Sequence, residues 1–136
     1  MTQEIKKKPK ILLIEDDYPT IQLYQDVFQK ANFDLEVLDW GQEAIDRLKE
    51  IREGKKEKPD LILLDLILLD TNGLFILKEA RKYPETKDLL IFALTNYTDP
   101  KLDQELIKEG IDKILVKTDY LPSKLIATIK EALNLK

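Results

Sequence analysis

The chain contains no cysteine and no histidine among its 136 residues. Without cysteine it can form neither disulfides nor thiolate metal sites. Without histidine it has no Ser-His or Cys-His catalytic pair and no histidine-ligated metal. Any metal held by side chains must therefore be bound through oxygen, which favours Mg²⁺, Ca²⁺ or Mn²⁺.

Long apolar runs and glycine-rich phosphate loops are absent from the sequence as well. No run approaches the ~20 apolar residues of a membrane span, and residues 1–9 lack the apolar core of a signal peptide. The lack of a glycine-rich loop means that nucleotide binding is not indicated. The net charge of -4 argues against a direct nucleic-acid partner. We therefore expect a cytoplasmic protein with no membrane and no nucleic-acid partner.

The length and composition are those of one globular domain. A chain of this size buries roughly 70% of its unfolded surface and can fold without disulfides or metals. The content of 43% hydrophobic and 35% charged residues is typical of a soluble protein. We expect a short tail at residues 1–9 followed by one domain at residues 10–136.

Short apolar runs alternate with amphipathic stretches along the chain. The runs predict strands at Lys10–Ile14, Asp34–Leu38, Asp60–Asp65, Leu89–Thr95 and Lys113–Lys117. The amphipathic stretches predict helices at Pro19–Ala31, Gln42–Arg52, Asn72 or Gly73 to Lys82, Pro100–Glu109 and from Pro122 onward. This alternation predicts an α/β fold, a doubly wound five-stranded parallel sheet covered by five helices.

Polar residues follow the apolar runs at their carboxyl ends. They are Glu15, Asp16, Asp65, Thr95, Asn96 and Lys117. In doubly wound sheets the carboxyl ends of the strands form the ligand site. Burying an unpaired carboxylate costs several kcal/mol, so these residues are expected to form one site.

The chemistry of this residue set suits phosphoryl transfer. Carboxylates about 4 Å apart repel by roughly 4 kcal/mol at an effective dielectric of 20, and a hard divalent cation relieves this repulsion. An aspartate can act as the nucleophile, while the metal, a lysine and a hydroxyl neutralise the phosphoryl oxygens. Ile67 stands two residues after Asp65, where a phosphatase would have a second aspartate. An acyl phosphate on Asp65 should therefore persist until water removes it.

The chain resembles a response-regulator receiver domain, a flavodoxin-like fold, from Lys10 to Leu133. The matching motifs are Ile11-Leu12-Leu13-Ile14-Glu15-Asp16-Asp17, Asp60-Leu61-Ile62-Leu63-Leu64-Asp65-Leu66, Asn72-Gly73, Leu94-Thr95 and Leu115-Val116-Lys117. Each motif alone has little specificity. Their order, and their position at the predicted strand ends, make the combination specific.

The resemblance implies a phosphoacceptor and a metal site. Asp65 would accept the phosphoryl group, and Asp16 and Asp65 would bind the metal directly. Glu15 would act through water, and the backbone carbonyl of Ile67 would be a further ligand. The family uses Mg²⁺, and Mn²⁺ fits the same ligands.

The resemblance also implies the residues that respond to phosphorylation. Thr95 would be the switch hydroxyl, with Asn96 next to it, and Lys117 would contact a phosphoryl oxygen. Ile114 occupies the position of the usual switch aromatic. Tyr97 and Ile67 flank the site where the family tunes dephosphorylation, and their bulk predicts a shielded, longer-lived acyl phosphate.

By the same resemblance the protein takes part in two-component or phosphorelay signalling. The phosphoryl donor would be a phosphohistidine on a sensor histidine kinase or a histidine phosphotransfer protein, and the output would be a contact with an unidentified downstream protein. The family also forms homodimers. We expect a stand-alone receiver, or a piece of a longer protein, that assists its own phosphorylation and dephosphorylation but does not turn over an external substrate.

Departures from the family pattern keep two alternatives open. Leu69 and Thr118 stand where prolines are usual, and a cis peptide bond at Thr118 is not expected. Together with Ile114, these changes favour a receiver-like interaction module with an impaired switch that works without phosphorylation. The second alternative, a metal-dependent hydrolase, would need a further general acid or base near Asp65.

Overall fold

A computed structural model describes residues 8–135 of the chain. In chain order its elements are β1 (Lys10–Ile14), α1 (Tyr18–Lys30), β2 (Asp34–Leu38), α2 (Gly41–Arg52), β3 (Leu61–Asp65), α3 (Gly73–Arg81), β4 (Ile91–Thr95), α4 (Pro100–Lys108), β5 (Lys113–Val116), a 3₁₀ turn η1 (Lys117–Asp119) and α5 (Pro122–Ala132). Of the tail expected at residues 1–9, residues 1–7 lie outside the described part.

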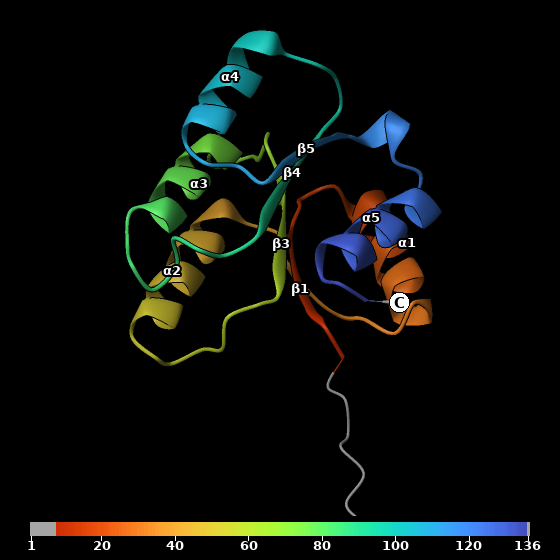
Figure 1. Ribbon diagram of the computed structural model, residues 1–136, viewed down its shortest axis with the longest axis horizontal. Coiled ribbons are helices and arrows are strands. Elements are labelled where there is room, and N and C mark those ends of the chain that lie inside the picture. Colours follow the sequence, from red (N-terminus) through yellow and green to blue (C-terminus); the bar gives the residue numbers. More distant parts are fainter. Residues whose placement is uncertain (1–7, 136) are drawn as a thin grey trace, which may run out of the picture.

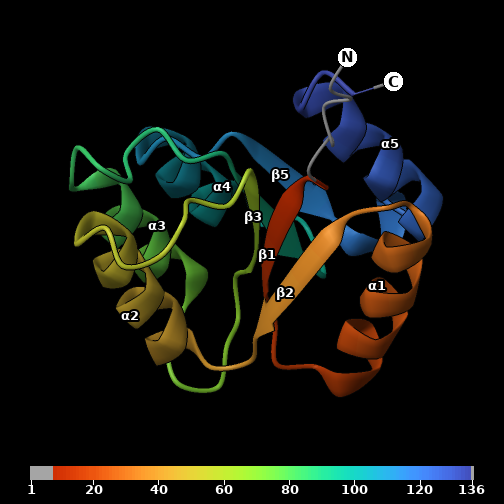
Figure 2. The same ribbon diagram turned by 90° about the horizontal axis from the view of Figure 1, so that it is seen from below.

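The strands form one five-stranded sheet in the order β2-β1-β3-β4-β5, and all neighbouring pairs are parallel. Helices α2, α3 and α4 cover one face, whereas α1 and α5 cover the other (Figures 1 and 2). The chain moves outward from β1 to β2 and then returns to the opposite side with β3. The expected doubly wound α/β fold is confirmed, and its topological switch point lies between β1 and β3.

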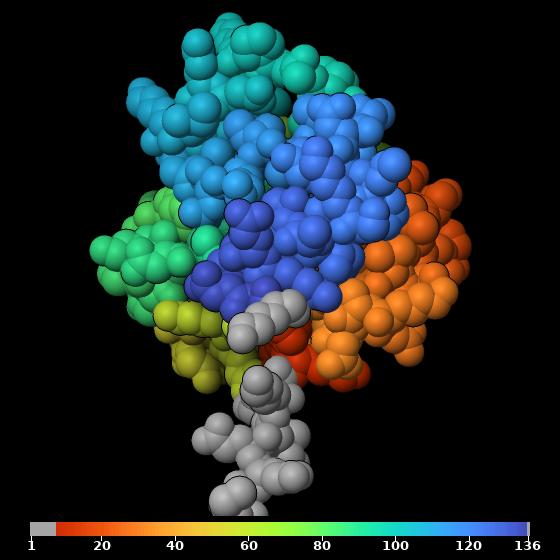
Figure 3. Space-filling view, turned by 45° about the vertical axis from the view of Figure 1, so that its right-hand side comes forward, coloured from red at the N-terminus to blue at the C-terminus, as the bar shows by residue number. Residues whose placement is uncertain are grey.

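The two faces of the sheet carry separate hydrophobic clusters. One cluster joins alternate strand residues such as Ile62 and Ile91 to α2, α3 and α4. The other joins the intervening residues, such as Leu63 and Phe92, to α1 and α5. Figure 3 shows the C-terminal part of the chain between α1 on one side and α3 on the other. Because β3 and β4 are buried on both faces, their sequences are continuously apolar.

The helix boundaries follow from local capping chemistry. Asp17, Asn72 and Asp99 accept hydrogen bonds from the first turns of α1, α3 and α4, respectively. Gly54 and Gly110 follow α2 and α4 with φ of 75° and 89°, a backbone region that favours glycine. None of the helices in residues 8–135 is long and apolar enough to cross a membrane.

Several expected boundaries were wrong by one or two residues. Strand β4 begins at Ile91 rather than Leu89, because the N–H of Leu89 donates to Thr86 O in the preceding turn. Strand β5 ends at Val116, and Lys117 opens η1 instead. No cis peptide bond occurs in the described chain, Thr118 included. The buried face of α3 includes Ile76, Leu77 and Ala80.

Candidate functional site

Three acidic side chains meet at the switch point. Strands β1 and β3 are adjacent, with Ile14 paired to Leu64, so the next residues, Glu15 and Asp65, emerge side by side. One carboxylate oxygen from each of Glu15, Asp16 and Asp65 lies within 4.8 Å of the others. This is the acidic cluster that the strand ends predicted.

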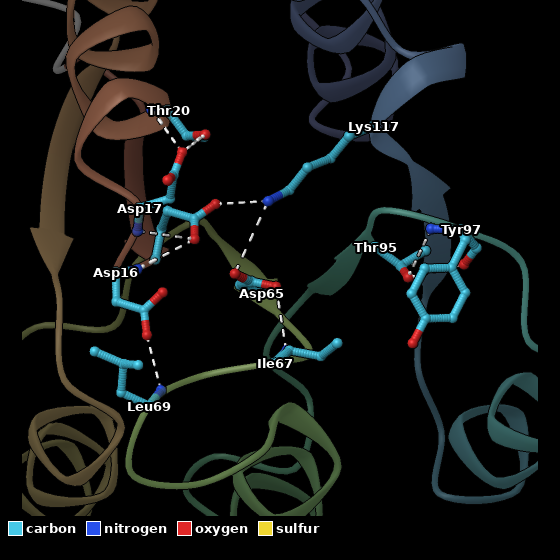
Figure 4. Close-up of polar contacts among 10 residues, drawn as sticks. Asp16, Asp17, Thr20, Asp65, Ile67, Leu69, Thr95, Tyr97 and Lys117 are labelled. Carbon is cyan, nitrogen blue, oxygen red and sulfur yellow. Dashed lines mark hydrogen bonds and ion pairs between the residues drawn. The ribbon is translucent and has the colours of Figure 1, made fainter.

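Lys117 reaches the cluster from η1, beyond the end of β5. Its Nζ donates to Oε1 of Glu15 at 2.8 Å and lies 3.8 Å from Oδ2 of Asp65 (Figure 4). Burial would lower the pKa of Lys117, but the hydrogen bond to Glu15 and the charges of Asp65 and Glu15 outweigh burial and raise it. The lysine is therefore a fixed positive charge shared unequally between two carboxylates.

Glu15 is fully buried, and its two carboxylate oxygens are engaged. Besides the bond from Lys117 to Oε1, Oε2 accepts the backbone N–H groups of Asp16 at 3.1 Å and Asp17 at 3.4 Å. Its own N–H extends the β1–β2 ladder by donating to Leu38 O at 3.1 Å. Glu15 is thus a rigid, internally satisfied anion that holds Lys117 in place.

Asp16 is half-buried and contacts the loop that follows β3. Its Oδ2 accepts the N–H of Leu69 at 2.8 Å (Figure 4). The contact joins residues 53 positions apart, and no sequence spacing indicates it. One candidate metal ligand therefore also supports the loop after Asp65.

Asp65 is buried, and its charge is compensated less directly than that of Glu15. It is 7% exposed, and its Oδ1 accepts the N–H of Ile67 at 3.2 Å. Burial first, then the neighbouring Glu15, raise the pKa of Asp65 from 3.8 to about 7, while Lys117 and the Ile67 N–H oppose the shift. A second positive charge beside Asp65 would reduce the electrostatic cost of ionising its carboxyl group.

Thr95 ends β4 and is buried, but its hydroxyl is turned toward its own loop. Oγ1 donates to Tyr97 O at 2.9 Å and accepts the Tyr97 N–H at 3.4 Å. Figure 4 shows Thr95 and Tyr97 together, to one side of Asp65. For the hydroxyl to reach a group on Asp65, its bond to Tyr97 O must break.

The remaining predicted residues lie around the acidic cluster or farther away. Asn96 is exposed, and the side chains of Ile67 and Tyr97 are 58% and 57% exposed, respectively. Ile114 is half-buried in β5 and packs against the cluster formed with α2, α3 and α4. The bulk of Ile67 and Tyr97 therefore lies largely in solvent.

Two aspartates next to the site cap helices. Asp17 precedes α1 and accepts the Thr20 N–H at 3.2 Å and the Thr20 hydroxyl at 2.5 Å. Asp70 lies in the loop between β3 and α3, and its carboxylate accepts the N–H groups of Gly41 and Gln42, both at 2.8 Å. The capped helix lies 29 residues earlier, so no local capping motif could have indicated this contact.

The donor set fits a hard divalent cation. The clustered side-chain donors are all carboxylate oxygens, the ligands that Mg²⁺ and Mn²⁺ prefer. Burial, followed by the neighbouring Glu15, raises the pKa of Asp65, so a cation bound beside its carboxylate would offset this cost of ionisation. The fit thus rests on both ligand chemistry and electrostatics.

Comparison with known proteins identifies the family. The model of the response regulator receiver domain family matches residues 11–130. The chain is 32% identical over 125 residues to the transcriptional regulatory protein CpxR homolog of Haemophilus influenzae, covering 92% of this chain and 50% of that protein. The chain belongs to the response regulator receiver domain family, whose members are phosphoacceptor domains of two-component signalling.

Solved structures agree with this assignment. Chemotaxis protein CheY4 of Vibrio cholerae matches with a TM-score of 0.78 and 25% identity, covering 91% of this chain and 98% of that one. The Mn²⁺-bound form of response regulator Rcp1 matches with a TM-score of 0.78 and 25% identity, covering 90% and 92%, respectively. The chain spans about half the length of the curated relatives it matches.

Proposed function

We propose that Asp65 is the residue that receives the phosphoryl group. Glu15 has both oxygens engaged by Lys117 and backbone N–H groups. By contrast, the cation nearest to Oδ2 of Asp65 is Nζ of Lys117, at 3.8 Å. This difference in engagement is the observation that most supports Asp65, because a nucleophile needs a lone pair that the fold does not already use.

The transfer is a displacement at phosphorus. A carboxylate oxygen of ionised Asp65 forms the new P–O bond as the P–N bond to the donor's imidazole breaks. The imidazole nitrogen keeps that electron pair and, once protonated, leaves as neutral histidine. Lys117 is placed to stabilise a phosphoryl oxygen, and Thr95 can donate to another after releasing Tyr97 O.

Asp16, Asp65 and the carbonyl of Ile67 would hold Mg²⁺ or Mn²⁺, with Glu15 acting through water. The ion would neutralise charge on the phosphoryl oxygens. Rcp1 has been solved in a Mn²⁺-bound form, which supports an ion of this kind in the present chain. Asn96 is exposed and Ile114 packs against a hydrophobic cluster, and their switch roles remain predictions.

The expected partners follow from this assignment. The phosphoryl donor would be a sensor histidine kinase or a histidine phosphotransfer protein, and the product would change contacts with a downstream protein or a second copy. Residues 10–136 would act as one receiver unit in the cytoplasm, without turnover of an external substrate.

The test is incubation with acetyl phosphate and Mg²⁺, followed by intact mass measurement. The parent protein should gain the mass of one phosphoryl group, and Asp65→Asn should not. Asp17→Asn is the matched control, because Asp17 is a nearby carboxylate that serves as a helix cap, and it should be labelled like the parent. If the parent gains no mass, the assignment is wrong and the phosphorylation-independent module is favoured. If Asp65→Asn gains as much mass as the parent, another residue is the acceptor and the assignment to Asp65 is wrong.

A further inference from the structure

The loop between β3 and α3, residues 66–72, follows Asp65 directly, and its Ile67 N–H donates to Asp65 Oδ1 at 3.2 Å. Its side chains alternate in burial: Leu66 and Leu68 are 4% and 8% exposed, whereas Ile67 and Leu69 are 58% and 81% exposed. An isolated bridge pairs Ile67 with Asn72, and the Leu68 N–H donates to Thr71 O at 3.2 Å. The loop is therefore held partly by hydrogen bonds within itself. Its exposed side chains, Ile67 and Leu69, contribute little to packing it against the rest of the protein.

Asp70 anchors this loop to α2. Its two oxygens accept the N–H groups of Gly41 and Gln42, each at 2.8 Å, at the positive end of the helix dipole. Trp40, at the N-cap position of α2, makes no side-chain capping bond. Asp70 thus supplies, from across the fold, a cap that the local sequence lacks.

The packing around Gly41 shows how closely the loop and helix approach. A Cβ on Gly41 would overlap Cγ2 of Thr71 and lie 2.9 Å from Oδ1 of Asp70 and 3.3 Å from Leu68. The absence of a side chain at Gly41 therefore permits the docking of this loop. Hydrogen bonding and steric fit independently indicate a built contact.

The second anchor of the loop is the bond from the Leu69 N–H to Asp16 Oδ2 at 2.8 Å (Figure 4). Asp16 is also a candidate metal ligand, so a bound cation and the Leu69 N–H would share its carboxylate. The Asp70 contact involves no member of the acidic cluster. It can therefore hold the loop whether or not a cation is bound.

We propose that Asp70 is a positioning residue for the metal site. By fixing residues 66–72 against α2, it fixes the position of Ile67, whose carbonyl is one of the proposed ligands, relative to Asp65 and so sets the affinity for the divalent cation. The inference rests on the proposed function, because it assumes that the acidic cluster binds Mg²⁺. Outer contacts that orient metal ligands typically change affinity by 10- to 100-fold when removed.

The test is titration of Asp70→Ala with Mg²⁺ by calorimetry, at a temperature where circular dichroism shows the fold to be intact. The Kd should rise roughly tenfold, and Asp70→Asn, which keeps one acceptor oxygen, should fall between that variant and the parent. Asp99→Ala is the matched control: it removes the cap of α4, where Asp99 accepts the Leu102 N–H at 3.2 Å, and should leave the Kd within twofold. An unchanged Kd in folded Asp70→Ala would overturn the proposal.

A second readout uses Trp40, the single tryptophan, which is 44% exposed next to Gly41. Mg²⁺ should change Trp40 emission in the parent through the docked loop, and this response should be lost in Asp70→Ala even at saturating Mg²⁺. If Asp70→Ala does not fold, Gly41→Ala should displace the same contact and raise the Kd, and a parent-like Kd there would count against the proposal. A parent that binds no Mg²⁺ would overturn the metal site of the proposed function, and this inference with it.

Discussion

Replacing Asp65 with asparagine should stabilise the protein near neutral pH when no divalent cation is present. Asp65 is 7% exposed, and burial followed by Glu15 raises its pKa from 3.8 to about 7. Asparagine keeps the shape of the side chain and removes the charge. The variant therefore isolates the electrostatic cost of one carboxylate.

The sign of the pH dependence follows from proton linkage. Between pH 4 and 7 folded Asp65 holds a proton that the unfolded chain has released, so the stability of the parent falls as pH rises through this window. At 1.36 kcal/mol for each pKa unit the full cost would be about 4 kcal/mol above pH 7. Because charges even at buried sites behave as if the effective dielectric were near 20, we expect roughly 1–2 kcal/mol of this cost to be measured.

The measurement is urea unfolding of the parent and Asp65→Asn in a chelator, from pH 4 to pH 8. The gain in unfolding free energy of the variant should be largest above pH 7 and shrink toward pH 4. Added Mg²⁺ should reverse the order by stabilising the parent more, by about 2.7 kcal/mol at 100 times its Kd. A gain that does not vary with pH, or equal responses to Mg²⁺, would refute the charge argument.

Two further predictions concern the rim of the site and the scaffold. Tyr97→Ala and Ile67→Asn should each shorten the half-life of phosphorylated Asp65, because the bulky side chains of Tyr97 and Ile67 are predicted to hinder the approach of water. The half-life is measured by loss of the added mass. An unchanged half-life in both variants would show that side chains this exposed do not shield the acyl phosphate. Arg81→Met should lower the unfolding free energy by about 2–3 kcal/mol, because Arg81 donates to the carbonyls of Lys87, Leu89 and Gly110 and to Asp112. A loss no larger than that of Lys82→Met, whose side chain is 63% exposed, would mean that these bonds contribute little.

The strands and the acidic cluster could be predicted because each depends on a local pattern. A strand buried on both faces must be continuously apolar, so the first polar residue after it marks the sheet edge. Parallel topology then brings Glu15 and Asp65 together without knowledge of any side-chain contact. The same reasoning placed Lys117 at this edge, although the chain had already turned into η1 at that residue.

The contacts that orient the site could not be predicted, because they depend on side-chain direction and long sequence separation. The Thr95 hydroxyl could have pointed toward Asp65 or toward Tyr97 O, and one torsion angle decides between them. The neighbouring sequence indicates only that Asp70 is a turn residue. Asp70 caps α2 because its loop packs against Gly41. Asp16 and Leu69 likewise meet only after β1 and β3 have paired.

The distribution of charge supports the proposal that Asp65, rather than Glu15, is the phosphoacceptor. Lys117 donates to Glu15 at 2.8 Å but lies 3.8 Å from Asp65, and Coulomb attraction falls with distance. Moreover, a hydrogen bond to a charged group contributes more than a distant charge does. The positive charge of Lys117 therefore stabilises ionised Glu15 more than ionised Asp65, and the pKa of the buried Asp65 is raised. The fold retains a carboxylate that destabilises it, and such local conflicts are expected where function, rather than stability, determines the residue.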